Sequence, residues 1–222
     1  MIVVHHLNNS RSQRILWLLE ELGLEYEIKK YQRDPKTMLA PPELRAVHPL
    51  GKSPVIQDGD VIVAESGAII EYLVDRYGAA LAPAAGTPER LRYTYFLHYA
   101  EGSAMPPLLL KLVFDRVESS PAPFFVRPIA RAIANKVKDT FVLPQIRQHL
   151  AYLEGELGKR TWFAGDAFSA ADIQMSFPLE AAAMRGGLDG QYPNLVAFLD
   201  KIHARPAYRR ALERGGKYDF AQ

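Results

Sequence analysis

Small polar side chains gather in the stretch 5-HHLNNSRSQRI-15, immediately ahead of an apolar run. Asn9, Ser10 and Arg11 offer an amide, a hydroxyl and a guanidinium in succession, and all three can donate hydrogen bonds to an anion. The same residue types occur at helix starts, where free amide groups also attract anions. The stretch therefore has two interpretations: a simple helix cap, or a place that holds a reactive anion.

Two adjacent histidines, His5 and His6, suggest a metal site in the same stretch. We expect residues 2–6 to form a strand, in which neighbouring side chains point to opposite faces and cannot readily bind one ion. The sequence therefore predicts one buried histidine, one exposed histidine and no metal.

A second polar segment, 49-PLGKSPV-55, precedes a β-rich run. Pro54 removes a donor that a strand would use. A cis Ser53–Pro54 bond would turn the N–H and C=O of Ser53 toward an extended peptide ligand, whereas a trans proline would simply begin the strand. Lys52 would meet a carboxylate of that ligand, or would be an ordinary solvated lysine. The residues alone leave both pairs of alternatives open.

Glu65 and Ser66 stand where another helix is expected to begin. In a purely structural interpretation Ser66 is the N-cap and Glu65 complements the helix dipole. In a binding interpretation the first amides and Ser66 hold a carboxylate, while Glu65 holds a neighbouring ammonium. Combined with Lys52 and Ser53, this describes a small, extended, doubly acidic peptide with one amine, and glutathione meets that description.

The elements that position these residues follow from the spacing of apolar side chains. Residues 2–6 and 26–31 read as strands around an amphipathic helix from about residue 15 to Gly23. Two β-rich runs flank Asp58-Gly59-Asp60, a hairpin signal, and a helix follows up to Gly78. Residues 33–49 carry four prolines and are expected to be irregular. Residues 1–78 therefore form an α/β domain of order βαβ-ββα with a mixed sheet.

Beyond a linker at residues 79–88, no strand pattern is present, and residues 89–222 are expected to form an all-α domain. A long helical stretch covers about 87–117, with Pro106-Pro107 expected to bend or break it. Further helices are expected at about 128–143, 144–157, 193–203 and 206–214. The segment 168-FSAAD-172 opens another helix as a capping box.

The composition excludes several function classes. The chain of 222 residues has no cysteine, which rules out disulfides, thiolate metal sites and protein-thiol chemistry. A formal net charge of +2 gives no reason to expect nucleic acid or an anionic membrane as a partner. No secretory signal and no membrane-spanning run are visible. A cytoplasmic protein is the expectation.

With these residues in view, the chain resembles the glutathione S-transferases over nearly all of its length. The resemblance rests on HPLGKSPV ahead of the hairpin, AES at the helix start, FSAAD, and the helical second half. The stretch LEELGLEYE is most similar to theta-like bacterial and fungal members with serine or another non-tyrosine residue at the active site. The resemblance implies a thioredoxin-like first domain with a four-stranded sheet, and a homodimer.

The resemblance also assigns roles to the residues of the first domain. It implies a cis bond at Pro54, contact of Lys52 with the glycyl carboxylate of glutathione, and contact of Ser53 with the cysteinyl backbone. Glu65 and Ser66 would meet the γ-glutamyl group. The reactive thiol would then be that of glutathione, bound as a co-substrate without a metal.

The sulfur needs a donor, because an unperturbed thiol has a pKa near ~8.5 and is mostly protonated at neutral pH. No tyrosine lies among residues 1–25, so the tyrosine of some relatives is unavailable. Ser10 aligns with the serine of theta-like members when Arg14 is laid on their following arginine. Asn9 is the alternative donor, Arg11 would supply charge, and Ser12 becomes the pure helix cap.

The segment 99-YAEGSAMPP-107 is expected to border the pocket for the second substrate, with Tyr99, Ser103 and Met105 as candidates. The expected activity is conjugation of glutathione to hydrophobic electrophiles, with reduction of organic peroxides as a related activity. The alternative is a ligandin-like protein that binds glutathione or apolar ligands with little turnover. Detoxification is the role that the family resemblance implies.

Overall fold

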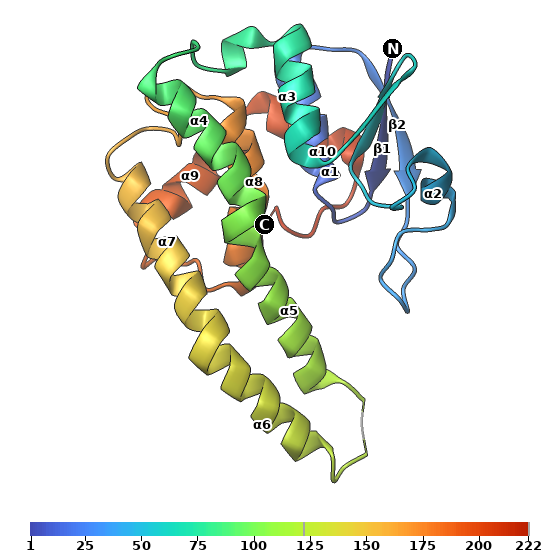
Figure 1. Ribbon diagram of the computed structural model, residues 1–222, viewed down its shortest axis with the longest axis vertical. Helices are drawn as coiled ribbons and strands as arrows, with labels where there is room; N and C mark the ends of the chain where they lie inside the picture. The colour runs from blue at the N-terminus through green and yellow to red at the C-terminus, as the bar shows by residue number, and fades with distance from the viewer. Residues whose placement is uncertain (122, 222) are drawn as a thin grey trace.

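Four short strands form one mixed sheet in the first third of the chain (Figure 1). The structure is a computed structural model and describes residues 1–121 and 123–221. Strand β1 (Ile2–Leu7) pairs in parallel with β2 (Tyr26–Tyr31) and antiparallel with β3 (Val55–Asp58), which pairs antiparallel with β4 (Val61–Ala64). The strand order is β2-β1-β3-β4. The predicted four-stranded, thioredoxin-like α/β fold is confirmed.

Helices cover both faces of this sheet. Helix α1 (Ser12–Leu22) connects β1 to β2, and α3 (Ser66–Tyr77) follows β4 on the same side. The short helix α2 (Glu43–Val47) lies in the segment that we expected to be irregular, and its Leu44 packs with Leu7 and Tyr31 on the opposite face. Gly23 ends α1 in a left-handed conformation, as its position after the apolar stripe predicted.

The two histidines of β1 are both buried, so the expectation of one exposed histidine is wrong. His5 and His6 are only 3% and 5% exposed. They do point to opposite faces: His5 Nδ1 lies 2.9 Å from the Tyr31 hydroxyl, and His6 Nδ1 lies 2.9 Å from the Ser12 hydroxyl. The expectation assumed one solvated face, whereas α2 and its flanking loops cover the second face of the sheet.

The rest of the chain is helical and contains two long rods that extend away from the sheet (Figure 1). A 3-10 turn at Ala79–Leu81 precedes the first rod, which contains α4 (Pro88–Tyr99) and α5 (Met105–Ser119). The second rod contains α6 (Arg127–Val137) and α7 (Leu143–Leu157). Helix α8 (Ala170–Arg185) runs through the core, and α9 (Pro193–His203) and α10 (Pro206–Gly215) follow.

A π-helical turn makes each rod continuous where a break was expected. The turns are Ala100–Ala104 between α4 and α5, and Lys138–Val142 between α6 and α7. Each is followed at once by proline in the first turn of the next helix, at Pro106-Pro107 and at Pro144. Because a π turn shifts the pairing to i→i+5, it accommodates residues that lack an N–H without ending the helix.

The start of α8 has the predicted capping box. Asp172 accepts hydrogen bonds from the N–H groups of Ser169, at 2.8 Å, and Phe163, at 2.9 Å. The aromatic rings of Trp17, Trp162 and Phe168 pack around this point. The cap therefore fixes the central helix against both α1 and the loop before α8. Among the described residues, no helix is both long and apolar enough to cross a bilayer.

Candidate active site

A cavity of about 570 Å³ opens between the carboxyl end of β1 and helices α5 and α8. Both parts of the molecule contribute to its walls. The sequence-predicted residues that line it are Asn9, Ser10, Arg11, Lys52, Ser53 and Met105. The structure therefore brings two polar segments of the first domain, separated by about 40 positions along the chain, to one cavity with part of the helical domain.

The loop from β1 to α1 places Ser10 at the floor of the cavity. Its hydroxyl accepts a hydrogen bond from the N–H of Ser12 and lies 2.7 Å from the Ser12 hydroxyl. Ser12 is the first residue of α1, and its own side chain turns back toward His6 and the carbonyl of Leu7. The prediction that Ser12 is the helix cap is therefore wrong, since the cap-like contact comes from Ser10.

Ser10, Ser12 and His6 form a chain of contacts that leads from the cavity into the core. Burial, followed by repulsion from Lys30, lowers the pKa of His6 to about 4. The imidazole is therefore neutral at neutral pH, and its Nδ1 faces the Ser12 hydroxyl. The hydroxyl of Ser12 is thereby held in place behind Ser10.

His6 is expected to make the protein less stable in mild acid. Its folded pKa is lowered, so the unfolded chain takes up a proton first, and stability falls as the pH drops from about 6.5 to about 4. We expect roughly 2 kcal/mol of the free energy of unfolding to be lost over this window. His6→Asn keeps an acceptor near the position of Nδ1 without titrating. Urea unfolding at several pH values should give a flatter curve for this variant, and parallel curves would contradict the assignment.

Asn9 is engaged by the C-terminal tail. Its side-chain amide donates to Asp219 Oδ2 at 2.7 Å, and its Oδ1 accepts from the N–H of Asp219 at 2.9 Å. The backbone of Asn9 has a φ of 49°, a left-handed conformation that asparagine tolerates. The next anchor of the tail is Tyr218, which donates to the buried carboxylate of Glu180 at 2.6 Å. Asn9 therefore holds the tail against the mouth of the cavity.

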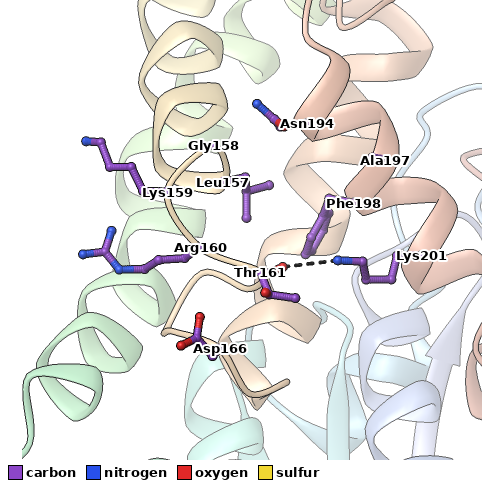
Figure 2. A pocket seen from close by; sticks show the side chains of 10 residues that line it. All are labelled: Leu157, Gly158, Lys159, Arg160, Thr161, Asp166, Asn194, Ala197, Phe198 and Lys201. Atoms are coloured by element: carbon purple, nitrogen blue, oxygen red, sulfur yellow. Dashed lines mark hydrogen bonds between the residues drawn. The ribbon is translucent and has the colours of Figure 1, made fainter.

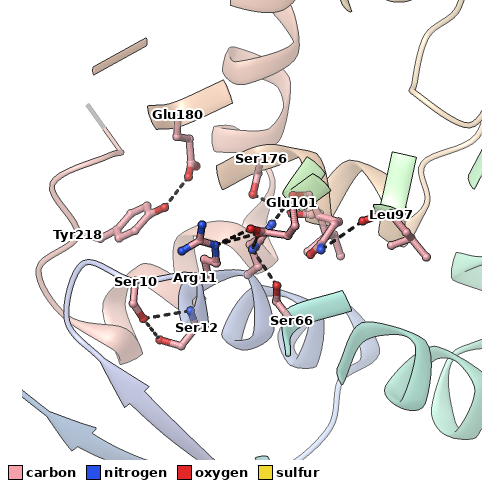
Figure 3. A network of polar contacts seen from close by, with 12 residues as sticks. Ser10, Arg11, Ser12, Ser66, Leu97, Glu101, Ser176, Glu180 and Tyr218 are labelled. Atoms are coloured by element: carbon pink, nitrogen blue, oxygen red, sulfur yellow. Dashed lines mark hydrogen bonds and ion pairs between the residues drawn. The ribbon is translucent and has the colours of Figure 1, made fainter. Parts of the chain in front are cut away.

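Arg14 is a buried cation at the boundary between the two domains. It belongs to the polar network that also contains Arg11, Ser66 and Glu101, which are labelled in Figure 3. It is 1% exposed, and its guanidinium donates to the Ser66 hydroxyl at 2.9 Å and to the carboxylate of Glu101. Arg11 donates to the same carboxylate at 2.9 Å. Two ion pairs with Glu101, a residue of the first π turn, and the hydrogen bond to Ser66 thus join the loop that carries Ser10 to the start of α3.

A proline within α8 explains why Arg14 is buried there. Pro178 has no N–H, so the carbonyl of Gln174, four residues earlier, lacks its usual helical donor. Arg14 Nη1 donates to this carbonyl at 2.5 Å. A side chain from α1 therefore satisfies a backbone acceptor of α8 that the sequence of α8 itself leaves unpaired.

Charge at this boundary is balanced by Glu101. Burial raises the pKa of Glu101, but Arg14 and Arg11 outweigh that effect and hold it below its usual value. The carboxylate is therefore ionised at neutral pH. Its stabilising contribution is present above the unfolded-state value and is lost as the pH falls below that value.

The loop before β3 presents Lys52 and Ser53 to the cavity. The Ser53–Pro54 peptide bond is cis, and Pro54 is buried behind it. The hydroxyl of Ser53 donates to the carbonyl of His5 at 2.9 Å and accepts from the N–H of Leu7 at 3.3 Å. The side chain thereby fixes this loop to β1, while Lys52 is exposed to solvent.

Glu65 and Ser66 differ from the predicted capping arrangement. Glu65 is the N-cap residue, with an exposed side chain and a φ of 70°, and Ser66 is the first residue of α3. Ser66 is buried and its hydroxyl accepts from Arg14 rather than from an amide of its own helix. The expectation that Ser66 is the N-cap is therefore wrong, because Arg14 recruits its side chain. Both residues lie outside the walls of the cavity.

Of the three residues proposed for the second-substrate pocket, the structure places Met105 in the cavity wall and the other two elsewhere. Tyr99 is buried beside His149, with its hydroxyl 2.5 Å from His149 Nδ1, and its ring packs against Tyr152. Ser103 lies in the π turn. Because that turn changes the angular phase of the helix, Glu101 and Met105 point toward the first domain while Tyr99 points away.

A second hollow, of about 340 Å³, lies between the end of α7 and α9 (Figure 2). Its cations already have partners: Lys159 and Arg160 lie 3.2 and 3.6 Å from the carboxylate of Glu156, and Lys201 lies over the ring of Trp162. None of the predicted site residues lines it. It is therefore a surface depression of the helical domain and not the site that the sequence describes.

Sequence reasoning missed two residues that support the site from the core and several that line the cavity. Arg14 lies on the apolar stripe of α1, four positions before Leu18. A charged residue on a face that is expected to be buried indicates a specific polar partner in the core. Pro178 within a predicted helix is a second such indication, because it implies an unpaired carbonyl. Missed cavity residues from distant helices and the C-terminal tail include Arg116, Phe177, Arg185, Asp219 and Phe220.

Both parts of the chain match known protein families. Residues 1–75 match the glutathione S-transferase N-terminal domain, and residues 123–206 match the glutathione S-transferase C-terminal domain. Glutathione S-transferase 3 of Schizosaccharomyces pombe is 39% identical over 215 residues, which cover 96% of this chain and 88% of the yeast protein.

Solved structures agree with the sequence matches. A glutathione S-transferase from Actinobacillus pleuropneumoniae is 35% identical, with a TM-score of 0.80 over 100% of this chain and 96% of that chain. A sphingomonad glutathione S-transferase complexed with glutathione is 28% identical, with a TM-score of 0.73 over 96% of this chain and 98% of that chain.

The fold and the cavity define a two-domain protein in which a thioredoxin-like domain and a helical domain share one site. Sequence identity places the protein within that class. The chain belongs to the glutathione S-transferase family.

Proposed function

We propose that this protein is a glutathione transferase, which binds glutathione, stabilises its thiolate and transfers it to hydrophobic electrophiles. The observation that carries the proposal is the composition of the cavity. Ser10, Lys52 and Ser53 of the first domain share it with apolar side chains of the helical domain, including Met105 and Phe177. A polar half that fits a peptide and an apolar half that fits an electrophile suit a two-substrate transfer.

The polar half is proposed to bind glutathione along the loop of residues 51–53. The exposed ammonium of Lys52 would meet the glycyl carboxylate, and the backbone of Ser53, which lies outside the strand ladder, would pair with the cysteinyl unit. Glu65 and the first amides of α3 would receive the γ-glutamyl group. Ser66 supports this position, because Arg14 fixes its side chain at the helix start.

Ser10 is proposed to donate its hydroxyl to the glutathione sulfur. It lines the cavity at the start of α1, where converging amides favour an anion. Its hydroxyl lies 2.7 Å from that of Ser12, and it donates to the sulfur when its hydrogen turns from Ser12 toward the cavity. Arg11 adds positive charge nearby. Asn9 remains the alternative donor, although its amide is engaged by Asp219.

We further propose that residues 1–78 form the glutathione-binding domain, 79–88 the linker, and 89–222 the domain that supplies the acceptor site and dimer contacts. Exposed apolar side chains on α4, Leu91 and Tyr95, support a homodimer, since a partner subunit would cover them. The family resemblance supports a cytoplasmic enzyme of detoxification. Met105 is the acceptor-pocket residue that the cavity wall supports; Tyr99 and Ser103 lack that support.

Two measurements test the proposed function. Calorimetric titration is expected to detect glutathione binding. Conjugation of 1-chloro-2,4-dinitrobenzene, followed by absorbance and corrected for the uncatalysed rate, is expected to show turnover, with reduction of cumene hydroperoxide assayed in parallel. Measurable glutathione binding together with zero rate for both acceptors would replace the transferase by the ligandin-like alternative.

A further inference from the structure

The cavity is rich in cations, and two of them are already occupied by the protein. Arg11 is ion-paired with Glu101. Arg33 is held by backbone carbonyls, with Nε donating to Asn8 at 3.2 Å and Nη1 donating to Met38 at 3.0 Å. These two arginines therefore have structural tasks. The basic residues of the cavity wall that remain are Arg45, Lys52, Arg116 and Arg185.

The remaining cations fall into two pairs that come from different domains. Arg45 and Lys52 belong to the first domain, and Lys52 lies in the loop proposed to bind glutathione. Arg116 lies in α5, and Arg185 is the last residue of α8. The glycyl and γ-glutamyl carboxylates are both assigned to the first domain, so glutathione does not account for the second pair.

Arg185 has an unused hydrogen-bond donor. Its Nε is buried and has no hydrogen-bond partner within residues 1–121 and 123–221. The nearby carboxylate of Asp115 is shared by Lys111, at 2.7 Å, and Lys138, at 3.0 Å. A buried donor without an acceptor is costly, and an incoming acceptor would remove that cost.

Repulsion between Arg185 and the neighbouring arginines also favours the binding of an anion. Burial, followed by repulsion from Arg116, lowers the pKa of Arg185; attraction to Asp115 opposes this effect, and Arg11 adds to it. Arginine nonetheless stays protonated in proteins, so the repulsion persists in the free enzyme. Asp219, the acidic residue of the cavity wall, accepts from Asn9 and lies 3.2 Å from Lys217.

Apolar surface surrounds this second pair. Phe177 and Met184 of α8 and Phe220 of the tail line the same cavity, and the guanidinium of Arg185 lies over the Phe220 ring at 5.3 Å. A flat apolar group can pack against these side chains while an attached anion reaches the guanidinium groups. Arginine is suited to this task because its planar fork matches a carboxylate in two places.

We propose that Arg116 and Arg185 form an anion subsite in the acceptor half of the cavity, so that the enzyme prefers hydrophobic electrophiles that carry a carboxylate or a similar anionic group. The inference rests on the proposed function for the identity of the reaction. The binding of the anion itself requires only the two arginines and the apolar wall.

A pair of matched acceptors tests the proposal with the full chain. We would compare 4-chloro-3,5-dinitrobenzoate with the neutral 4-chloro-3,5-dinitrobenzamide, dividing each kcat/KM by the uncatalysed rate with glutathione. The unmodified enzyme is expected to favour the benzoate about tenfold, the effect of one charge-assisted hydrogen bond. Arg185→Gln is expected to remove this preference, Arg185→Lys to keep part of it, and Arg116→Gln to reduce it.

Two control measurements distinguish loss of the anion subsite from a general effect on folding or on catalysis. Arg131→Gln removes an exposed arginine of α6 outside the cavity and should leave the preference unchanged. Calorimetric binding of the unreactive 3,5-dinitrobenzoate and 3,5-dinitrobenzamide gives a readout without catalysis. Equal binding of the two probes, or equal weakening of both by Arg185→Gln, would overturn the subsite. Anion binding that depends on Arg185 without turnover of either acceptor would retain the subsite and reject the transferase.

Discussion

Ser10→Ala is expected to lower kcat/KM for conjugation about 100-fold while leaving the KM for glutathione nearly unchanged. Removing a single donor that faces a developing or bound anion typically costs two to three orders of magnitude in rate. The hydroxyl of Ser10 lines the cavity at the start of α1, so its loss should raise the pKa of the bound thiol toward the value of free thiols. The measurement is the pH dependence of kcat/KM with 1-chloro-2,4-dinitrobenzene.

Two neighbours supply controls for this prediction. Ser12→Ala also removes a hydroxyl group, but this hydroxyl lies behind Ser10, one contact farther from the cavity. The substitution should therefore change the pH profile much less. Asn9→Ala should loosen the C-terminal tail, because Asn9 makes two hydrogen bonds with Asp219. If Asn9→Ala shifts the thiol pKa and Ser10→Ala does not, the amide is the partner of the sulfur and the assignment of Ser10 is wrong.

Arg14→Met is expected to lower the free energy of unfolding by about 3 kcal/mol, because it breaks a buried ion pair and leaves acceptors unsatisfied. Methionine replaces most of the apolar stem but donates nothing to Ser66, Glu101 or the carbonyl of Gln174. Glutathione binding should weaken as well, since Ser66 loses the contact that fixes its side chain. Urea unfolding and calorimetric titration measure the two effects.

A second substitution tests the hydrogen bond from Arg14 to the carbonyl of Gln174 separately. Pro178→Ala restores an N–H that can donate to the carbonyl of Gln174, so in the Arg14→Met background it should recover about 1 kcal/mol. In the unmodified background it should add little, because Arg14 already donates there. Strictly additive effects in this double-mutant cycle would contradict the idea that Arg14 replaces the missing donor of Pro178.

The parts that could be predicted from sequence are those encoded locally. The βαβ-ββα order follows from apolar spacing and the Asp-Gly turn, and the capping box from four adjacent residues. Lys52 and Ser53 stood out because their residue types and surroundings describe a peptide ligand. The elements and these two residues needed only short windows of the chain, whereas the assignment of Ser10 relied on the family resemblance.

The remainder depends on contacts between distant segments, which a single sequence does not specify. The burial of His5 required knowing that α2 covers its face of the sheet. Tyr99 lies away from the cavity because a π turn alters the helical phase, and no residue type in the segment predicts such a turn. Arg185 and Asp219 reach the cavity from the end of α8 and from the tail, and their neighbours become visible only once the helices are packed.

The hydrogen bond from Arg14 to the carbonyl of Gln174 also determines whether the two domains can be produced separately. Expressed alone, the α/β domain would expose a guanidinium that is normally buried, and the helical domain would expose an apolar helix with an unpaired carbonyl. Each fragment would then lack a group that the other supplies. The two domains are therefore expected to be obtainable as one folded unit and not as separate soluble halves, even though each has its own recognisable sequence pattern.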